Sequence, residues 1–239
     1  MTGDRAGVSW QDVSVTLGDD VRVLESVTLA VDAGEVLGVV GPNGAGKSTL
    51  FRATCGLVAY TGEIDVAGER VRPGHPPAGV AALVEQPAFY PWASGRQNLD
   101  LLAACRGIGR EAVEDALRDA DLWDVRDRRV RAYSQGMRQR LGLASVFLSG
   151  AQVVLLDEPA TALDPPAVQW LRDTVAALRD AGRAVLIASH VLTAVEREAD
   201  HVAVLARGAL VLHEHVDALA ERGGLERVFL QVVGGGTAL

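Results

Sequence analysis

The sequence predicts an α/β fold built around a mostly parallel β-sheet. Short apolar runs of strand length alternate with stretches whose apolar residues recur at helical spacing. A glycine-rich loop follows the first fully buried run, and a second run of the same length ends in two acidic residues. Because parallel strands need helical crossovers, this alternation is typical of a parallel sheet with helices on both faces.

The first part of the chain predicts strands. Two β-rich stretches, 9–17 and 21–31, are separated by a turn sequence of glycine and two aspartates. They predict an antiparallel β subdomain at the N-terminus. The run Val36–Val40 then predicts a buried strand, followed by the glycine loop and a helix over 48–57. Further strands are predicted over 63–66 and 80–85.

The middle of the chain is helical in pattern. A helix over 110–122 would place Val113 and Leu117 on one face, and a second helix is predicted over 135–148. We expect residues 94–148 to form a helical subdomain inserted into a core. That core would consist of residues 1–93 and 149–239, so the whole chain, 1–239, would form one domain.

In the last third of the chain, predicted strands again alternate with predicted helices. Val153–Asp157 predicts a buried strand, and a helix should begin after Asp164, a good N-cap, with Pro165 in its first turn. This helix should stop at Gly182. The remaining strands are predicted over 184–189, 201–206 and 209–213, with a short helix between the first two.

Charge and composition exclude several classes of protein. The chain has 239 residues with 23 basic and 31 acidic side chains, a net charge of −8. This balance argues against sequence-independent nucleic-acid binding and against direct docking on anionic lipid. No apolar run approaches the roughly 18–20 residues of a membrane helix. Any association with a membrane is therefore expected to run through a protein partner.

Two types of side chain are rare in this sequence. Lys47 is the single lysine among 23 basic residues, and it lies in the glycine loop. A compact ammonium fits inside a loop wrapped around phosphate, where a planar guanidinium would not. The two cysteines, Cys55 and Cys105, are expected to be free, buried thiols in a reducing compartment.

A phosphate-binding loop is predicted after Val36–Val40. Residues 41–48 match G-x-x-x-x-G-K-[ST] between a strand and a helix, as in P-loop NTPases. Backbone N–H groups and the helix N-terminus would bind phosphate, Lys47 would reach the β- and γ-phosphates, and Ser48 would ligate Mg²⁺. The residues expected to bind the nucleotide are Gly41, Pro42, Asn43, Gly44, Ala45, Gly46, Lys47, Ser48 and Thr49.

Two acidic residues stand at the carboxyl end of the strand Val153–Asp157, where ligands of open α/β sheets bind. We expect Asp157 to orient Mg²⁺, through water. Glu158, one residue on, should point elsewhere and activate the attacking water as general base. Without the glycine loop, two solvated acids at a strand end would be the better interpretation.

The stretch YSQGMRQR at 133–140 resembles the signature motif of the ABC ATPases, usually LSGGQ followed by QR. Ser134 is a good N-cap, and the free N–H groups of the helix start form an anion site. The resemblance implies a head-to-tail dimer, which we expect to contain two copies of the chain. In it, Ser134, Gln135 and Gly136 of one copy would contact ATP held by the other.

Other positions fit the same family in order. Gln86 is similar to the Q-loop glutamine, which senses Mg²⁺ and the lytic water. Asp164 is similar to the D-loop aspartate, which crosses the dimer interface toward the second ATP. His190 is similar to the switch histidine that contacts the γ-phosphate. Where the family often stacks adenine on an aromatic ring, the spacing places Leu17.

The aromatics Phe89, Tyr90 and Trp92 directly follow Gln86. They are either local core or a patch that receives a short helix from a membrane subunit. The form YSxGMxQRL resembles the branch of the family that exports drugs, lipids or polysaccharides through a separate transmembrane permease.

Together the motifs predict a MgATP-hydrolysing subunit of an ABC transporter. It would be cytoplasmic, held on the inner face of the cell membrane by its permease partner, and would not bind nucleic acid. A soluble ABC ATPase of a non-transport class, such as cofactor assembly, stays open as the alternative. A P-loop kinase or GTPase fits poorly because the signature would have no role.

Overall fold

The computed structural model of the chain describes residues 6–18, 20–84 and 87–234. A four-stranded antiparallel sheet has the order β2-β1-β4-β5, and a six-stranded sheet has the order β10-β9-β3-β8-β7-β6. The strands are β1 (Ala6–Leu17), β2 (Val21–Asp32), β3 (Val36–Val40), β4 (Thr61–Val66), β5 (Glu69–Arg70), β6 (Val80–Leu83), β7 (Val153–Asp157), β8 (Ala184–Ala188), β9 (His201–Ala206) and β10 (Ala209–His215).

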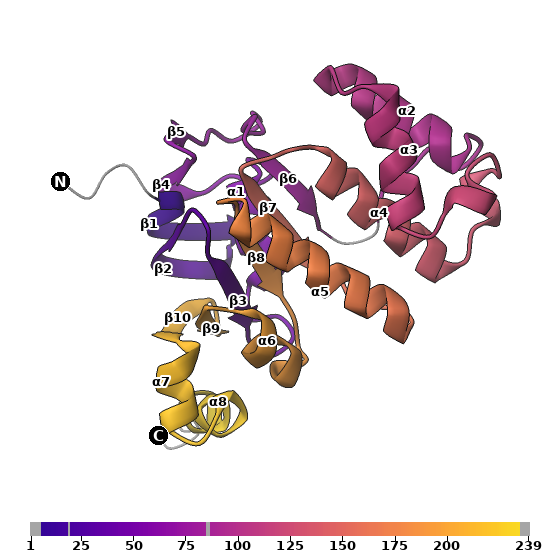
Figure 1. Ribbon diagram of the computed structural model, residues 1–239. Helices are drawn as coiled ribbons and strands as arrows, with labels where there is room; N and C mark the ends of the chain where they lie inside the picture. Colours follow the sequence, from indigo (N-terminus) through magenta and orange to yellow (C-terminus); the bar gives the residue numbers. More distant parts are fainter. Residues whose placement is uncertain (1–5, 19, 85–86, 235–239) are drawn as a thin grey trace.

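Helices follow β3, β6, β7, β8 and β10 along the chain (Figure 1). They are α1 (Lys47–Thr54), α2 (Gly95–Arg106), α3 (Arg110–Asp119), α4 (Gln135–Leu148), α5 (Pro165–Asp180), α6 (Leu192–Glu198), α7 (Val216–Glu221) and α8 (Leu225–Gly234). Two short 3₁₀ helices, Trp123–Val125 and Val130–Ala132, lie between α3 and α4. Within the described ranges, no helix combines the length and the apolar character that a membrane span requires.

The six-stranded sheet brings the predicted acidic and histidine residues to the carboxyl-terminal ends of its central strands. It is parallel from β9 to β6, and β10 at its border is antiparallel. The registers pair Ala188 of β8 with both Val39 of β3 and Asp157 of β7. The carboxyl ends of three neighbouring strands therefore meet where the glycine loop begins.

The two faces of this sheet are covered differently. One face packs against α1 and the antiparallel sheet, and Phe51 of α1 is fully buried there. The indole N–H of Trp10, in β1, donates to the Thr54 hydroxyl at 3.0 Å and so ties the antiparallel sheet to α1. The other face packs against α5, whose Leu171 and Val175 are buried. The expected α/β fold with an antiparallel subdomain is confirmed.

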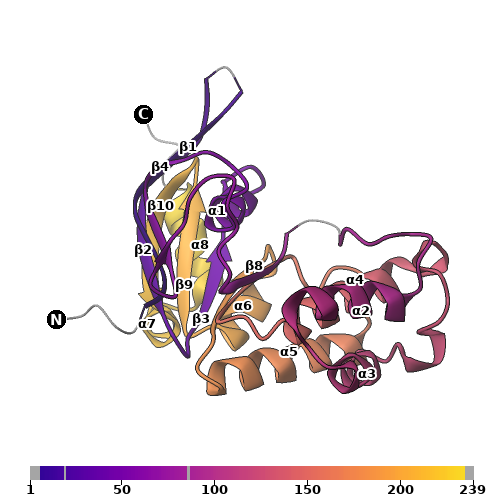
Figure 2. The same cartoon turned by 90° about the horizontal axis from the view of Figure 1, so that it is seen from above.

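Helices α2, α3 and α4 form a block that projects to one side of the sheets (Figure 2). They share an apolar core to which each helix contributes a fully buried leucine: Leu99, Leu117 and Leu141. A reciprocal pair of hydrogen bonds between Ser94 and Gln97 caps the start of α2. This block lies within the residues predicted as an inserted subdomain, and the boundaries at 94 and 148 stay a prediction.

Several elements differ from the sequence prediction. Helix α1 ends at Thr54 rather than at residue 57, because Gly56 takes a left-handed φ of 68°. The short strand β5 and the helices α7 and α8 were not predicted. Cys55 is buried as expected, but Cys105 is exposed, because it lies on the opposite side of α2 from the buried Leu99 and Ala103.

The Trp10 contact leads to a prediction about stability. Replacing Trp10 with Phe removes the indole N–H and leaves unfilled volume between β1 and α1, so we expect the free energy of unfolding to fall by about 1–3 kcal/mol. Urea denaturation followed by circular dichroism measures this change. Trp92→Phe is the matched control, because the Trp92 side chain is 66% exposed and should change stability little. Equal effects of the two substitutions would contradict the prediction.

Candidate functional site: a phosphate pocket with paired carboxylates

The glycine loop between β3 and α1 requires glycine at position 46, directly before the helix. Gly46 has a φ of 106°, and a Cβ there would lie 2.5 Å from the side chain of Leu24. No side chain caps α1, which starts at Lys47. The first backbone N–H groups of α1 are therefore available to an anion at the loop.

The Lys47 ammonium is held inside this loop. The side chain is only 8% exposed, and its Nζ donates to the carbonyl oxygens of Gly41 at 2.7 Å and Pro42 at 3.3 Å. An ammonium has three N–H donors, so one is left for a ligand in the pocket. Gly41 and Pro42 thus act by positioning the lysine.

Asp157 meets the start of α1 across the site. The Ser48 hydroxyl donates a hydrogen bond to its carboxylate. Burial raises the pKa of Asp157, while the bond from Ser48 and the charge of Lys47 lower it and the charge of Glu158 raises it. A partly buried carboxylate beside a hydroxyl is a set of hard oxygen donors, which is the kind that Mg²⁺ prefers. The residues present therefore fit the predicted metal.

Glu158 turns away from Asp157 and contacts His190. Its φ of 49° is left-handed, and its backbone N–H donates to the carbonyl of Ala188 at 2.8 Å. The Glu158 Oε2 lies 2.8 Å from the Nδ1 of His190, just beyond β8. Because an ionised carboxylate only accepts hydrogen bonds, Nδ1 carries the proton in this contact. The neighbouring acids therefore have different partners, as the sequence predicts.

These groups open onto one pocket of about 260 Å³. It combines backbone N–H groups, an ammonium, two hydroxyls and two carboxylates, so it can bind a phosphate chain and polarise a water molecule. Gln86, predicted to join this site, lies outside the described residues. The residues that line the pocket are Val23, Asn43, Gly44, Ala45, Gly46, Lys47, Ser48, Thr49, Asp157 and Glu158.

The start of α4 forms part of a different pocket, of about 340 Å³, which shares no lining residue with the first. The Ser134 hydroxyl caps α4 by accepting from the N–H of Met137 at 3.2 Å. A Cβ on Gly136 would lie 2.8 Å from the carbonyl oxygen of Ala162, so this glycine permits close contact with the loop after β7. Gln135 is exposed beside it.

Arg140 binds the two sides of this second pocket together, a role that the sequence analysis missed. Its guanidinium contacts Asp164 at 2.6 Å and Asp121 at 2.8 Å. Asp164 also caps α5 by accepting from the N–H of Ala167 at 3.3 Å. The bridges to Arg140 lower the pKa of Asp164. Arg140 therefore links the signature-like helix α4 to the segment before α5.

The remaining predicted residues lie outside the phosphate pocket. Leu17 pairs with Val21 at the end of the β1–β2 hairpin and does not line the phosphate pocket, whereas Val23 does. Phe89 packs against the core of the helical block, as local core would. Tyr90 and Trp92 are 51% and 66% exposed, with ring centroids 5.3 Å apart, so they form a small aromatic surface.

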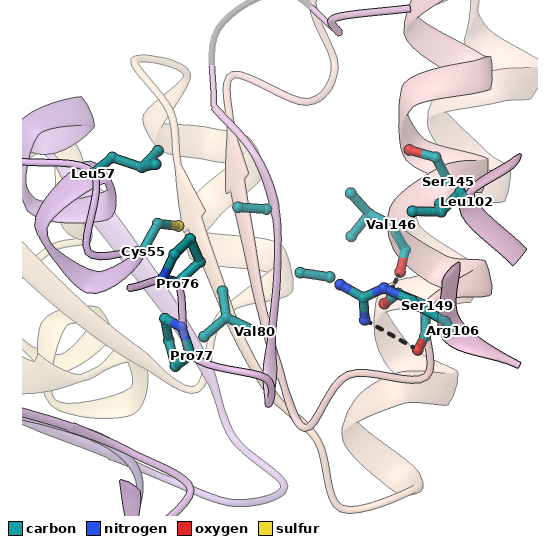
Figure 3. Close-up of a pocket in the computed structure, with 12 residues that line it drawn as sticks. Cys55, Leu57, Pro76, Pro77, Val80, Leu102, Arg106, Ser145, Val146 and Ser149 are labelled. Carbon is teal, nitrogen blue, oxygen red and sulfur yellow. Dashed lines mark hydrogen bonds between the residues drawn. The ribbon is translucent and has the colours of Figure 1, made fainter. Parts of the chain in front are cut away.

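A third pocket, of about 250 Å³, separates the sheet from the helical block (Figure 3). Leu57 and Val80 line one side and Leu102 and Val146 the other. Arg106 lies on the same side as Leu102 and donates to the carbonyl of Ser149 at 3.5 Å. This pocket contains no carboxylate, so it lacks the acid–base groups of the phosphate pocket.

Comparison with known proteins agrees with this geometry. The family model described as ABC transporter matches residues 24–161. The uncharacterized ABC transporter ATP-binding protein YhcH of Bacillus subtilis is 36% identical over 194 residues, covering 79% of this chain and 64% of the relative. This chain thus spans less than two thirds of that relative. The lantibiotic transport ATP-binding protein SrtF of Streptococcus pyogenes is 30% identical over 195 residues, covering 82% of this chain and 85% of the relative.

A solved ATP-binding subunit of an ABC transporter superposes with a TM-score of 0.87 at 26% identity, over 94% of this chain and 98% of that one. Its fold therefore includes both the sheets and the helical block. The sequence match covers the glycine loop, the signature-like helix and both acidic residues. The chain belongs to the ABC transporter family of ATP-binding proteins.

Proposed function

We propose that this chain is the ATP-hydrolysing subunit that powers export through a separate transmembrane permease. The observation that carries the proposal is the Glu158–His190 pair beside a loop that holds Lys47 for phosphate. A nucleotide-binding protein needs only the loop. A carboxylate that is oriented by a histidine at the same pocket also supplies a base for water.

The chain's own residues divide the work of hydrolysis. Lys47 and the backbone N–H groups of the loop bind the phosphate chain and neutralise its charge. Glu158 accepts a proton from the attacking water through its carboxylate. His190, hydrogen-bonded through Nδ1, keeps that carboxylate oriented and has its Nε2 left to contact the terminal phosphate.

Ser48 and Asp157 would hold Mg²⁺, together with Gln86, as the sequence predicts. When bound, the ion would neutralise charge on the β- and γ-phosphate oxygens. The hydrogen bond from Ser48 to Asp157 brings the two oxygen donors together, which supports the assignment.

Two copies of the chain would complete the reaction site. The Ser134 end of α4 lines a pocket separate from the loop of the same molecule, so a contact with ATP requires another copy. Its helix N-terminus can bind an anion such as the γ-phosphate. Asp164 and Gln135 lie on the same surface and would face the second ATP.

The export role is supported by relatives and by the aromatic surface. SrtF, named for lantibiotic transport, matches over most of both chains. Tyr90 and Trp92 are exposed anchors of the kind that dominates protein interfaces, and Phe89 fixes their loop to the helical block. This favours transport over a cofactor-assembly role. The chain would then be cytoplasmic and would lie on the inner face of the cell membrane through its permease.

Replacing Glu158 with Gln tests the catalytic base. The amide keeps the shape but cannot accept the proton, so we expect phosphate release to fall at least about 100-fold while ATP binding persists. ATP-bound dimers should accumulate, which size-exclusion chromatography with light scattering detects. Glu221→Gln removes the same charge from exposed α7 and should leave hydrolysis unchanged. Wild-type turnover in Glu158→Gln would refute the assignment.

Chemical labelling of Lys47 tests the phosphate site. Lys47 is the only side-chain amine, so an amine-reactive acetylating reagent should modify just two groups, Lys47 and the N-terminus. We expect MgATP to protect Lys47 at least about tenfold, because the phosphates would cover its ammonium. Peptide mass mapping measures both groups, and the N-terminal amine is the internal control. Undiminished labelling under saturating MgATP would exclude this loop as the site.

The aromatic surface predicts an uncoupled variant. Replacing both Tyr90 and Trp92 with Ala removes the exposed anchors, so we expect transport to fall at least about tenfold while nucleotide binding survives. Transport in reconstituted vesicles and nucleotide affinity in solution measure the two effects. Leu230→Ala removes a side chain of similar exposure, 64%, from α8 and is the control. Unchanged transport would retire the docking assignment.

A further inference from the structure

The aromatic loop of residues 90–96 is joined along its length by an arginine-rich segment, residues 126–131. The backbone N–H groups of Arg131 and Val130 donate to the carbonyls of Pro91 and Ala93, each at 2.9 Å, and Arg96 donates to Arg126 at 2.9 Å. Ser94 also forms a bridge with Arg129. These two segments therefore make one continuous surface.

The first two residues of this arginine-rich segment, Arg126 and Asp127, already contact other residues of the chain. The guanidinium of Arg126 lies 4.0 Å from the ring centre of Trp123, with Arg118 at 4.2 Å and Arg96 at 5.4 Å. Asp127, the acid of the segment, lies within 3.6 Å of both Arg96 and Arg126. The Asp127 carboxylate and the Trp123 ring therefore already have cationic partners within the chain.

The other three arginines of the segment have no such partners among the described residues. Arg128, Arg129 and Arg131 are exposed, and within the described part of the chain their side chains form no ion pair or hydrogen bond. We name these three residues the arginine strip. Backbone contacts place Arg131 opposite Pro91, which lies between Tyr90 and Trp92 in the chain, and Arg129 opposite Ser94.

The part of the chain that carries most of this surface differs in net charge from the rest of the molecule. Residues 94–148 contain ten arginines and eight acidic residues, a net charge of +2, which leaves −10 for the remainder of the chain. Exposed guanidinium groups that have no ion-pair partner among the described residues, in an otherwise acidic protein, favour an anionic partner.

We propose that the arginine strip binds an acidic segment of the transmembrane permease, next to an apolar residue that docks on Tyr90 and Trp92. The inference rests on the proposed function, because the partner is the same permease. The geometry requires two kinds of side chain in one short segment: an apolar or aromatic anchor and carboxylates beside it. Bidentate guanidinium–carboxylate contacts would then fix the orientation of the segment.

Anionic lipid fits this surface less well than an acidic protein segment. Lipid-binding clusters usually contain about four to eight basic residues, and three arginines in a protein of charge −8 fall short of that. The neighbouring rings also provide a hot spot of the kind that protein segments use. A protein segment with both features is therefore the better occupant.

A photo-crosslinker in place of Trp92 tests the inference. The full chain, carrying Trp92→p-benzoylphenylalanine, is expressed in its native host and irradiated in isolated membranes, and the cross-linked peptide is sequenced by mass spectrometry. We expect a membrane-spanning protein, cross-linked within a segment that carries at least two acidic residues. Adding Arg129→Gln and Arg131→Gln should lower the yield roughly fivefold, because two exposed charge contacts are lost. High salt should lower the unmodified yield in the same way.

The matched control is Arg197→Gln with Arg227→Gln, which removes the same charge from exposed positions elsewhere and should keep the yield. Equal yields for the two double variants would overturn the inference, as would a cross-linked segment without acidic residues. Both outcomes would leave the proposed function standing. Cross-links to lipid, to a second copy of the chain, or to no membrane-spanning protein would instead remove the docking surface itself.

Discussion

The site depends on the close packing of the glycine loop against β2. At Gly46 the backbone passes so near Leu24 and Val23 that a side chain would overlap with them. This contact fixes the loop between the two sheets, and the loop in turn fixes the Lys47 ammonium through two of its own carbonyls. The antiparallel sheet is therefore a wall of the phosphate pocket, which explains why Val23 lines it.

The divergence of Asp157 and Glu158 has an equally local cause. A strand would place neighbouring side chains on opposite faces, but β7 ends at Asp157 and Glu158 takes a left-handed φ of 49°. The hydrogen bond from its N–H to Ala188 holds that conformation at the edge of the sheet. Asp157 therefore contacts Ser48, and Glu158 contacts His190. The hydrogen bonds between the neighbouring strands stabilise the unfavourable φ of Glu158.

Prediction from sequence succeeded where a feature is encoded within one segment. The strands Val36–Val40 and Val153–Asp157 have the predicted bounds, because central parallel strands are apolar on both faces and end abruptly at the site. The contact of Val23 with the pocket and the bridges of Arg140 to Asp121 and Asp164 were missed. These contacts join residues that are distant in sequence. The residues next to an arginine in a helix do not indicate which acidic residue it will contact.

The same distinction explains why the aromatic surface was only half understood from the sequence. Phe89, Tyr90 and Trp92 look alike in the chain, yet Phe89 packs inward and the other two do not. What separates them is the segment before α4, which pairs with their loop and buries the Tyr133 ring beneath it. The Tyr133 hydroxyl donates to the carbonyl of Val125 at 2.9 Å, and the next residue in the chain is Ser134. The segment that pairs with the aromatic loop is therefore continuous in the chain with the cap of α4.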